Sequence, residues 1–432
     1  MTRQRSYLHL GENIDASKFV IVDFYVESDK DILETAEALA AESSIGTWTD
    51  VQTMNSDVFS TLAARIFYAN ADENIVKIAY PLELFEGENL AQLFSDVAGN
   101  VFGMKEINNL RVRDIRFPEA YVRMFEGPAF GIEGIRSVLE AGDRPLLGTI
   151  IKPKVGLSAD EHAKVAYEAW VGGVDIVKDD ENLTNQSFNP FEERVVKTII
   201  ARKKAEDATG KRKVYAPNIS APVSEMMDRA EFVKVQGGRV LMLDILTVGF
   251  SAVQHIRAQN FGMILHGHRA MHGAFTNNTK HGIAMLPIAK IARLAGIDQL
   301  HTGTVVGKME GDEETVDEIN DAMRKKWFDV KRTMPIASGG VHPGLIPEVI
   351  KRVEGEVIIN LGGGIHGHPD GTQSGAKAAF QALEAAMEDV PLREYAKDHK
   401  ELAKAIEKWG VYGDSREMTK ELVTYKYGLK EK

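Results

Sequence analysis

Two lysine- and acid-containing motifs hold side chains that could transfer protons and bind a divalent metal. Lys152 and Lys154 flank a proline directly after an apolar run, so the alternation of a strand predicts that both point to one face. Neighbouring ammonium groups lower each other's pKa, which makes one of them a candidate proton donor. Lys178, Asp180 and Glu181 follow the next apolar run, and such paired carboxylates suit Mg2+. Taken alone, each motif is also explained by a solvated charged loop.

Histidine and arginine side chains follow two later apolar runs. The sequence HGHR ends in His268 and Arg269, which could serve as an acid–base group near pH 7 and as a phosphate ligand. His301 follows the next run, and residues 305–311 after it place glycines on both sides of Lys308. This glycine-flanked lysine predicts a mobile lid. A structural histidine and an ordinary loop are the alternative interpretations.

Two glycine-rich turns follow the last two apolar runs. The backbone N–H groups of such turns can converge on an anion. One glycine triplet is weak evidence, whereas two at corresponding positions are much stronger. The pattern therefore predicts a phosphate site that includes Ser338, Gly339, Gly340, Gly362 and Gly363.

The elements that must position these groups form a regular series from about residue 144 onwards. Eight short apolar runs, each ending in polar or glycine residues, alternate with helical segments. The runs lie at 146–151, 174–177, 214–216, 240–243, 263–265, 299–300, 334–337 and 357–359. Eight such units in roughly 250 residues predict a (β/α)8 TIM barrel, whose catalytic groups gather at the C-terminal ends of the strands. Asn218 and Asp244, at two other strand ends, could orient a metal site. An open doubly wound sheet is the alternative.

The segment before the barrel mixes strands and helices. Residues 19–26 and 75–80 are β-rich, and helices are expected over 31–41, with an Asp cap, and around 89–98. The predicted fold is therefore α/β, with an N-terminal α+β (ferredoxin-like) domain over 1–125. The barrel with a C-terminal helical extension is expected over 126–432.

The composition excludes several classes of protein. The chain has 44% hydrophobic and 27% charged residues and a net charge of −11, which argues against nucleic acid or an anionic membrane as a partner. It has no cysteine, so disulfides, zinc thiolate sites and thiol catalysis are excluded. Neither a secretory signal nor an apolar stretch long enough to span a bilayer is visible. A cytoplasmic location is expected.

Taken in order, the motifs resemble those of the large subunit of ribulose-1,5-bisphosphate carboxylase/oxygenase (Rubisco). The matching segments are AESSIGTWT (41–49), AGNVFGMK (98–105), GTIIKPKVGLS (148–158), GGVDIVKDDENL (172–183), HGHRAMH (266–272), HTGTVVGKMEG (301–311), ASGGVHPG (337–344) and LGGGIHGHPDG (361–371). Several are highly specific, and eight in order leave little room for coincidence. The segments AFGIEG (129–134) and IEKWG (406–410) are most similar to archaeal members.

The resemblance implies a carbon–carbon lyase that carboxylates ribulose 1,5-bisphosphate to two molecules of 3-phosphoglycerate, with a competing oxygenase reaction. Lys178 would be carbamylated by a non-substrate CO2, and the carbamate would hold Mg2+ together with Asp180 and Glu181. Flanking lysines would favour the neutral amine that attacks CO2. The metal would polarise the sugar carbonyl and hydroxyl while the carbamate removes the C3 proton.

The resemblance also implies roles for the remaining candidates. Lys308 would stabilise the new carboxylate, Lys152 would reprotonate the last carbanion with Lys154 adjusting its pKa, and His268 would assist proton transfer and hydration. One phosphate would lie on Thr47, Trp48, Gly340, Gly362 and Gly363, near Gly339, and the other on Arg269, His301 and Ser338.

In the family, part of each site comes from the neighbouring subunit, so the smallest active unit is expected to be a homodimer without a small subunit. The residues that would complete the neighbour's site are Glu42, Thr47, Trp48 and Asn100. Dimers could assemble further. By analogy with archaeal relatives, the bisphosphate would come from nucleotide-derived ribose (AMP metabolism) or from a kinase acting on ribulose 5-phosphate.

Some residues depart from the family pattern. About 22 residues separate the lid from the seventh strand, fewer than in most relatives, and the tail after Trp409 is short, which argues against a tail that latches the lid. Asn360 stands where many relatives have Gln, and Ile365-His366 where many have Thr-Leu. Lid closure and CO2/O2 selectivity are therefore left open.

Two other functions remain as alternatives. A Rubisco-like enolase or isomerase of a methionine-salvage sugar phosphate would share the barrel, metal and carbamate, but it typically lacks several residues needed for carboxylation. Those residues are present here: Glu42, Asn100, Lys152, His268, His301, Lys308 and Ser338. A non-catalytic barrel that senses sugar phosphates would be favoured by a disrupted metal triad, and this triad is intact.

Overall fold

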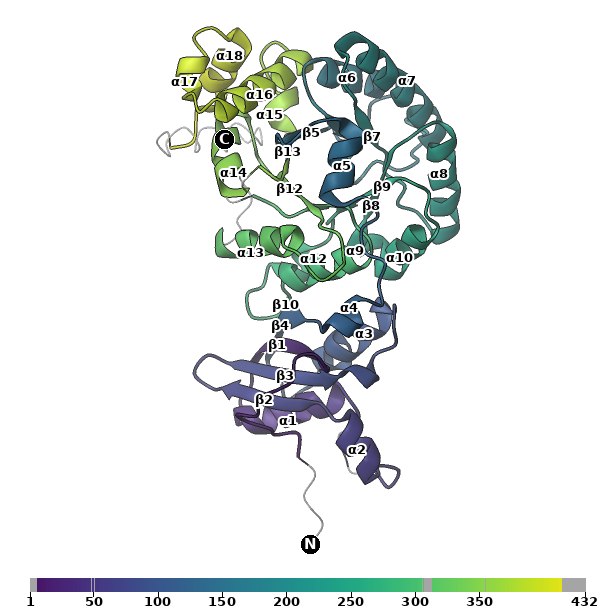
Figure 1. Ribbon diagram of the computed structural model, residues 1–432, viewed down its shortest axis with the longest axis vertical. Helices are drawn as coiled ribbons and strands as arrows, with labels where there is room; N and C mark the ends of the chain where they lie inside the picture. Colours follow the sequence, from purple (N-terminus) through teal and green to yellow (C-terminus); the bar gives the residue numbers. More distant parts are fainter. Residues whose placement is uncertain are drawn as a thin grey trace, which may run out of the picture.

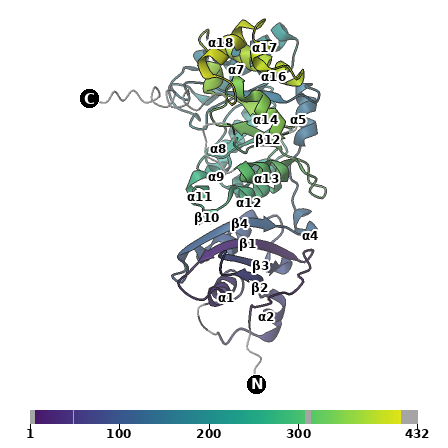
Figure 2. The same ribbon diagram turned by 90° about the vertical axis from the view of Figure 1, so that its left-hand side faces the viewer.

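The computed structural model describes residues 6–47, 49, 51–304, 306, 313–353 and 355–413. Trp48 and Lys308, both predicted site residues, lie outside this part of the chain. The structure contains two sheets, one in a small unit near the N-terminus and one in a barrel surrounded by helices (Figure 1). The turned view shows the same two parts stacked along the long axis (Figure 2).

The N-terminal sheet has five strands in the order β10-β4-β1-β3-β2. Its strands are β1 (Phe19–Glu27), β2 (Arg65–Asn70), β3 (Ile75–Pro81), β4 (Asn109–Arg116) and β10 (Gly282–Ile283), and its helices are α1 (Ile32–Glu42), α2 (Ser56–Leu62) and α3 (Leu90–Ala98). Without β10 and α2, the order β-α-β-β-α-β and the strand order 4-1-3-2 are those of a ferredoxin-like domain. This part of the fold prediction is confirmed.

The local sequence explains these elements. Val20, Val22 and Phe24 alternate along β1 and are fully buried, as expected for a strand with one face on a core. The side chain of Asp31 accepts hydrogen bonds from the amides of Leu33 and Glu34 and so caps α1, as predicted. The strands over 19–26 and 75–80 and the helix over 89–98 are present within one residue of the predicted bounds.

The second sheet is a barrel of eight parallel strands in the order β7-β6-β5-β13-β12-β11-β9-β8. The strands are β5 (Leu146–Ile150), β6 (Ile176–Lys178), β7 (Val214–Ala216), β8 (Val240–Asp244), β9 (Ile264–His268), β11 (Gln299–His301), β12 (Met334–Ser338) and β13 (Ile358–Asn360). A parallel bridge between Asn218 and Met242 joins the two end strands, so the sheet nearly closes. All eight predicted runs form strands, and the open doubly wound alternative is wrong.

Helices surround the barrel (Figure 1). They are α6 (Ala159–Val171), α7 (Phe191–Thr209), α8 (Val223–Val235), α9 (Ile245–Val248), α10 (Phe250–Ala258), α11 (Gly273–Thr276), α12 (Met285–Leu294), α13 (Glu313–Arg324), α14 (Ile346–Val353), α15 (Gly363–His366), α16 (Thr372–Met387), α17 (Leu392–Tyr395) and α18 (Lys400–Trp409). Ser158 and Glu161 form the predicted capping box of α6.

One end of the barrel is closed by apolar side chains. Helix α5 (Gly131–Leu139) buries Ile132, Ile135 and Leu139 in a cluster with apolar residues from β5, β6, β7, β8, β9, β12 and β13. Most of these strand residues, such as Leu146 and Ile176, lie at the N-terminal ends of their strands. The polar motifs therefore lie at the opposite, C-terminal ends, which is where active sites of this fold are found.

The two sheets are linked through β10, a two-residue strand that follows α11 and pairs with β4. The guanidinium of Arg111 on β4 donates to the backbone oxygens of Thr276 and Asn278. Phe94 of α3 stacks on Phe250 of α10, with ring centroids 5.5 Å apart. This linkage was not anticipated from the sequence. The predicted domain boundary at residues 125/126 lies between α4 (Glu119–Val122) and α5 and stays a prediction.

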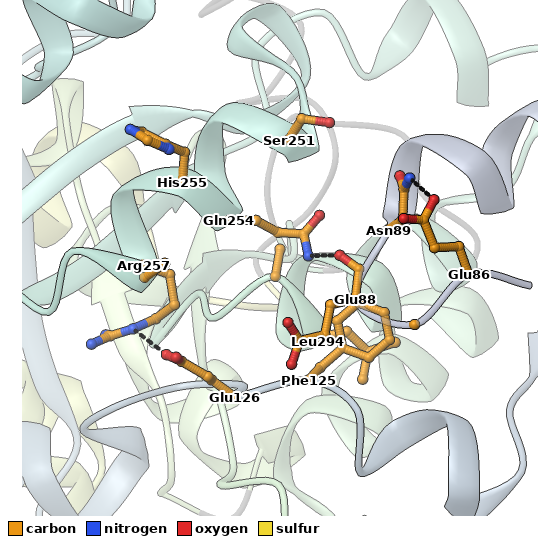
Figure 3. A pocket seen from close by; sticks show the side chains of 13 residues that line it. Glu86, Glu88, Asn89, Phe125, Glu126, Ser251, Gln254, His255, Arg257 and Leu294 are labelled. Carbon is orange, nitrogen blue, oxygen red and sulfur yellow. Dashed lines mark hydrogen bonds and ion pairs between the residues drawn. The ribbon is translucent and has the colours of Figure 1, made fainter.

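A cavity of about 430 Å³ lies at this junction, between α10 and residues 86–89 and 125–126 (Figure 3). In it, Nε2 of Gln254 donates to the backbone oxygen of Glu88 at 2.6 Å, and Nε of Arg257 lies 3.8 Å from Oε2 of Glu126. None of its lining residues belongs to the predicted site. Within the described residues, no helix is both long and apolar enough to cross a bilayer.

Candidate active site

Lys178 is the last residue of β6, and its side chain points into the barrel. It is 1% exposed, its Nζ donates to the backbone oxygen of Asp179 at 2.7 Å, and the same atom lies 3.8 Å from Oε2 of Glu181. Burial lowers the pKa of Lys178, and although Glu181 and two further carboxylates oppose this shift, they do not cancel it. The site therefore favours the neutral amine, which is the nucleophilic form of lysine.

Asp180 and Glu181 lie beside this amine as ionised carboxylates. Asp180 accepts hydrogen bonds from Nζ of Lys152 at 2.7 Å and from Asn182, and these bonds lower its pKa although burial raises it. Burial also raises the pKa of Glu181, but the charges of His268 and Lys178 outweigh it, so the pKa of Glu181 is lowered. The carboxylates of Asp180 and Glu181 are therefore ionised although they lie in a largely buried part of the site.

These residues fit Mg2+ only as part of a larger donor set. Within the described ranges, no three His, Cys, Asp or Glu side chains are grouped so that they could hold a metal ion. Asp180 and Glu181 supply two hard oxygen ligands, which suit Mg2+. The side chain of Lys178 could supply a third only if its amine carried a carboxylate.

The strand that was expected to carry the two lysines after β5 ends before them. The strand ends at Ile150, so its alternation does not extend to Lys152 and Lys154. Lys152 is half-buried and paired with Asp180, whereas Lys154 is exposed. Strand β6 ends at Lys178, so Asp180 reaches the site from the turn that follows it.

Three histidines from two neighbouring strands lie together at the barrel mouth. Nε2 of His266 lies 3.0 Å from Nε2 of His301, whose Nδ1 lies 2.8 Å from Oγ of Ser338. The rings of His268 and His301 are edge to face, with centroids 4.8 Å apart. Burial is the main cause that lowers the pKa of His266 to about 3 and the pKa of His301 well below its usual value. Both rings are therefore neutral near pH 7.

His268 connects this cluster to the carboxylates. Its Nε2 lies 3.5 Å from Oε2 of Glu181, and its Nδ1 lies 3.2 Å from Oδ1 of Asp244. The Nδ2 group of Asn218 donates to the backbone oxygen of Glu181 at 3.1 Å and to Oδ2 of Asp244 at 3.3 Å. Asn218 and Asp244 thus lie where they can orient the carboxylate segment, as the sequence suggested.

Asp179 is a residue that sequence reasoning missed. It is fully buried and accepts hydrogen bonds from the hydroxyl of Tyr215 at 2.6 Å, from Nε of Arg194 at 3.1 Å and from the amide of Asn218 at 3.0 Å. Nε2 of His162 lies 3.1 Å away. Burial raises the pKa of Asp179, but Arg194 and the other donors outweigh it and hold the pKa well below its usual range. This network anchors the backbone between Lys178 and Asp180.

The two glycine turns lie side by side. Ser338 and Asn360, the last residues of β12 and β13, are register partners, so both turns begin at the same level. Gly339 and Gly340 have φ values of 112° and 76°, which other residues rarely adopt. A Cβ on Gly362 would lie 3.3 Å from Cε of Lys152, so the second turn faces the lysine. Gly363 begins the short helix α15.

Arg269 follows His268 directly after β9, and its charge acts on His301. Burial lowers the pKa of Arg269 to about 10, and within the described part of the chain no carboxylate pairs with its guanidinium. A Cβ on Gly303 would lie 2.6 Å from one guanidinium nitrogen, so Gly303 lies directly beside Arg269, and its φ of 95° is one that other residues rarely adopt. A half-buried cation without an acidic partner among the described residues is suited to an anionic ligand.

The predicted N-terminal site residues lie elsewhere. Nδ2 of Asn100 donates to Oε1 of Glu42 at 3.2 Å, and Thr47 is exposed. Among the described residues, no hydrogen bond or ion pair joins these three to the barrel. Figures 1 and 2 both show α1, which ends at Glu42, in the small unit and apart from the barrel strands. Within one chain, this group does not reach Lys178.

The fold and the polar strand ends define a (β/α)8 barrel protein with an additional N-terminal domain and a candidate catalytic centre at the barrel mouth. Residues 131–409 match the family model of the ribulose bisphosphate carboxylase large chain, catalytic domain, and residues 11–121 match the model of its N-terminal domain. The chain belongs to the family of ribulose bisphosphate carboxylase (Rubisco) large chains.

Archaeal proteins are among its relatives. The ribulose bisphosphate carboxylase of Methanocaldococcus jannaschii is 51% identical over 395 residues, which cover 87% of this chain and 93% of the relative. The ribulose bisphosphate carboxylase of Pyrococcus abyssi is 49% identical, and the match covers 90% of this chain and 93% of the relative. Among solved structures, octameric Rubisco from Pyrococcus horikoshii OT3 in complex with sulfate ion has a TM-score of 0.90 at 47% identity, with 94% and 96% covered. Dimeric Rubisco from Hyperthermus butylicus has a TM-score of 0.87 at 41% identity, with 93% and 98% covered.

Proposed function

We propose that this chain carboxylates ribulose 1,5-bisphosphate to two molecules of 3-phosphoglycerate, with a competing oxygenase reaction, and that it depends on Mg2+ and a carbamylated lysine. The observation that carries the proposal is the buried Lys178 amine, whose pKa is lowered and which lies 3.8 Å from Glu181 in a member of the Rubisco family. An amine with a lowered pKa beside two carboxylates is the arrangement that carbamylation and metal binding require together.

Carbamylation is the first step. The lone pair of the Lys178 amine attacks the carbon of CO2, a C–N bond forms, and one amine proton is released to solvent. The product is an anion beside Asp180 and Glu181, so it is stable only when a cation balances the three charges. The three side chains would hold Mg2+, which when bound supplies Lewis-acid polarisation of the sugar carbonyl and hydroxyl oxygens.

The chain's own side chains then move the protons. The carbamate on Lys178 would take the C3 proton of the sugar, which would leave the enediolate that adds CO2. Lys308 stabilises the new carboxylate, and His268 assists proton transfer and hydration of the adduct. Lys152 returns a proton to the carbanion left after C–C cleavage, with Lys154 as a neighbouring cation. The positions of Lys152 and His268 next to the two acids support these roles.

The substrate phosphates would bind at the two sides of the mouth. Gly340, Gly362 and Gly363, near Gly339, would offer backbone N–H groups to one phosphate, together with Thr47 and Trp48 of a second subunit. Arg269, His301 and Ser338 would bind the other. The adjacent glycine turns and the Arg269 guanidinium, which pairs with no carboxylate of the described residues, support this division.

The active unit would be a homodimer with shared sites and no small subunit, and such dimers could assemble further. The separation of Glu42 and Asn100 from the barrel supports a site completed by Glu42, Thr47, Trp48 and Asn100 of the neighbour. Relatives described as dimeric and octameric are consistent with this arrangement. We further propose a cytoplasmic enzyme whose substrate derives from AMP metabolism or from phosphorylation of ribulose 5-phosphate.

The test is CO2 fixation by the purified chain. The protein is preincubated anaerobically with bicarbonate and Mg2+ and then given ribulose 1,5-bisphosphate and labelled CO2. Labelled 3-phosphoglycerate that depends on preincubation is the expected result. Absence of product from a folded dimer with bound Mg2+ would contradict the proposal and favour a Rubisco-like enolase or isomerase, for which thiopentulose phosphates are the substrates to test.

A further inference from the structure

A chain of hydrogen bonds crosses three neighbouring strands beside the candidate active site. It runs from Oε1 of Gln299 to Nδ1 of His266 at 2.9 Å, from Nε2 of His266 to Nε2 of His301 at 3.0 Å, and from Nδ1 of His301 to Oγ of Ser338 at 2.8 Å. The first three side chains are at most 3% exposed. Only Ser338, at the end of β12, approaches the glycine turns.

The two histidines in this chain have coupled tautomers. Burial keeps both rings neutral, so each carries one N–H. Where the two Nε2 atoms meet, one must donate and the other must accept. If His301 donates there, its Nδ1 has no hydrogen and accepts from Ser338. If His266 donates there, the Nδ1 of His301 carries the hydrogen and donates to Ser338. The hydrogens in this hydrogen-bond chain can therefore be placed in only two ways.

We propose that Gln299 selects between these arrangements and is a positioning residue for Ser338. The carbonyl oxygen of its amide faces Nδ1 of His266 and can only accept, so this Nδ1 carries the hydrogen. Nε2 of His266 then accepts from His301, and Nδ1 of His301 accepts from the hydroxyl of Ser338. The amide nitrogen of Gln299 has no partner among the described residues, so only its carbonyl end acts on the chain.

The selected direction fixes how Ser338 meets a ligand. Its hydroxyl hydrogen is directed at His301, so toward the barrel mouth the oxygen offers lone pairs only. The ligand must then supply the hydrogen, so in the phosphate site proposed above Ser338 would accept from a protonated phosphate oxygen or a neighbouring sugar hydroxyl, and Arg269 would supply the hydrogens to the charged oxygens. This consequence depends on the proposed function, in which Ser338 contacts the substrate. The direction of the hydrogen bonds from Gln299 to Ser338 does not depend on the proposed function.

Neutron diffraction from deuterium-exchanged crystals of the full-length protein tests the direction. The expected result is deuterium on Nδ1 of His266 and on Nε2 of His301. In Gln299→Leu, no acceptor faces Nδ1 of His266, so the deuterium should move to its Nε2 and the chain should reverse. Deuterium on Nδ1 of His301 in the wild type, or an unchanged chain in Gln299→Leu, overturns the proposal. The wild-type crystal alone decides the direction if the variant does not fold.

Kinetics test the effect on the substrate independently of the diffraction result. Gln299→Leu should lower kcat/KM for the bisphosphate by about tenfold, because the hydroxyl of Ser338 would then meet the substrate with the wrong donor and acceptor in one hydrogen bond. The matched control is Gln381→Leu, which makes the same change at a buried glutamine on α16. The amide of Gln381 contacts Glu401 and Leu402. This variant should change kcat/KM by less than about twofold. Equal values for wild type and Gln299→Leu overturn the positioning role. A wild type without any carboxylase activity instead contradicts the proposed function.

Discussion

The ammonium group of Lys152 lies 2.7 Å from Oδ2 of Asp180, and Oδ1 of the same carboxylate accepts from Asn182. Lys152, the candidate proton donor, is thus paired with Asp180, which is also a candidate metal ligand. In this structure Lys152 supplies a positive charge next to Asp180. A cation held by Asp180 would supply that charge instead, and Lys152, whose Cε lies 3.3 Å from the position of a Cβ on Gly362, would no longer be needed as the partner of Asp180.

Replacing Lys152 with Met should separate activation from catalysis. The carbamate and Mg2+ should still bind, because removal of a neighbouring cation reduces repulsion of the metal, although activation should be slower because Lys152 no longer helps to lower the pKa of Lys178. Carboxylation should fall by about 10²–10⁴-fold, the usual contribution of a positioned proton donor. Trapping of labelled activator CO2 and product formation measure the two effects. Lys154→Met, at the exposed lysine, should cost less, and equal losses in both variants would argue against the assigned roles.

Replacing Lys178 with Ala should abolish activity without unfolding the protein. The loss should be about a thousandfold or more, because both the base and a metal ligand are removed. The segment should stay in place because Asp179, with its buried partners Arg194 and Tyr215, anchors it. Product assays and circular dichroism give the two readouts. Retained turnover would contradict the carbamate assignment.

The rate of activation by CO2 should rise with pH around a midpoint below the ordinary lysine value of 10.5. Burial lowers the pKa of Lys178, and only the neutral form, which predominates above the pKa, attacks CO2. The measurement is the initial rate of activation at a fixed concentration of dissolved CO2 over a series of pH values, with all samples assayed at one common pH. A midpoint at the ordinary lysine value, or a rate that falls as pH rises, would be inconsistent with a desolvated amine.

The sequence was sufficient for the barrel because strands buried on both faces appear as continuous apolar runs. Residues 240–243 are an example, and all four are fully buried. Predictions of which way side chains point held where the strand covers the residues, as for His266 and His268 on β9. They have no basis for Lys152 and Lys154, because β5 ends before them and no periodicity applies to a turn.

Contacts between distant segments could not be predicted in this way. Asp179 appeared to be one acid of a charged loop, and its partners come from α6, α7 and the residues around β7. The pairing of β10 with β4 involves two residues, too few to give a periodic signal. The sequence likewise gave no reason to connect Gln299 with Ser338, since two histidines on neighbouring strands lie between them.

Replacing Asp179 with Ala should destabilise the protein by about 3–5 kcal/mol, because it leaves the buried guanidinium of Arg194 without its carboxylate. Denaturant-induced unfolding monitored by fluorescence measures the effect. Asp160→Ala is the matched control, since it removes an exposed carboxylate that pairs with Lys197 and should cost less than about 1 kcal/mol. Similar losses in the two variants would show that the Asp179 network does not anchor the segment.

Mixing two inactive variants tests whether neighbouring subunits share the site. Glu42→Gln removes a residue of the N-terminal unit, and Lys178→Ala removes one of the barrel. If each site takes Lys178 from one subunit and Glu42 from the other, a hybrid dimer holds one intact site and one site that lacks both residues. Each variant alone has no intact site.

Equal amounts of the two variants, unfolded together and refolded at random, should give half hybrid dimers, so the mixture should recover about a quarter of wild-type activity. The measurement is labelled CO2 fixation after preincubation with bicarbonate and Mg2+. As a control, each variant is also refolded alone, which measures any activity that one variant shows without the other. If Glu42 instead served the barrel of its own chain, every site in the mixture would lack one residue, and no activity would return. The separation of Glu42 from the barrel in the present fold leads us to expect recovery.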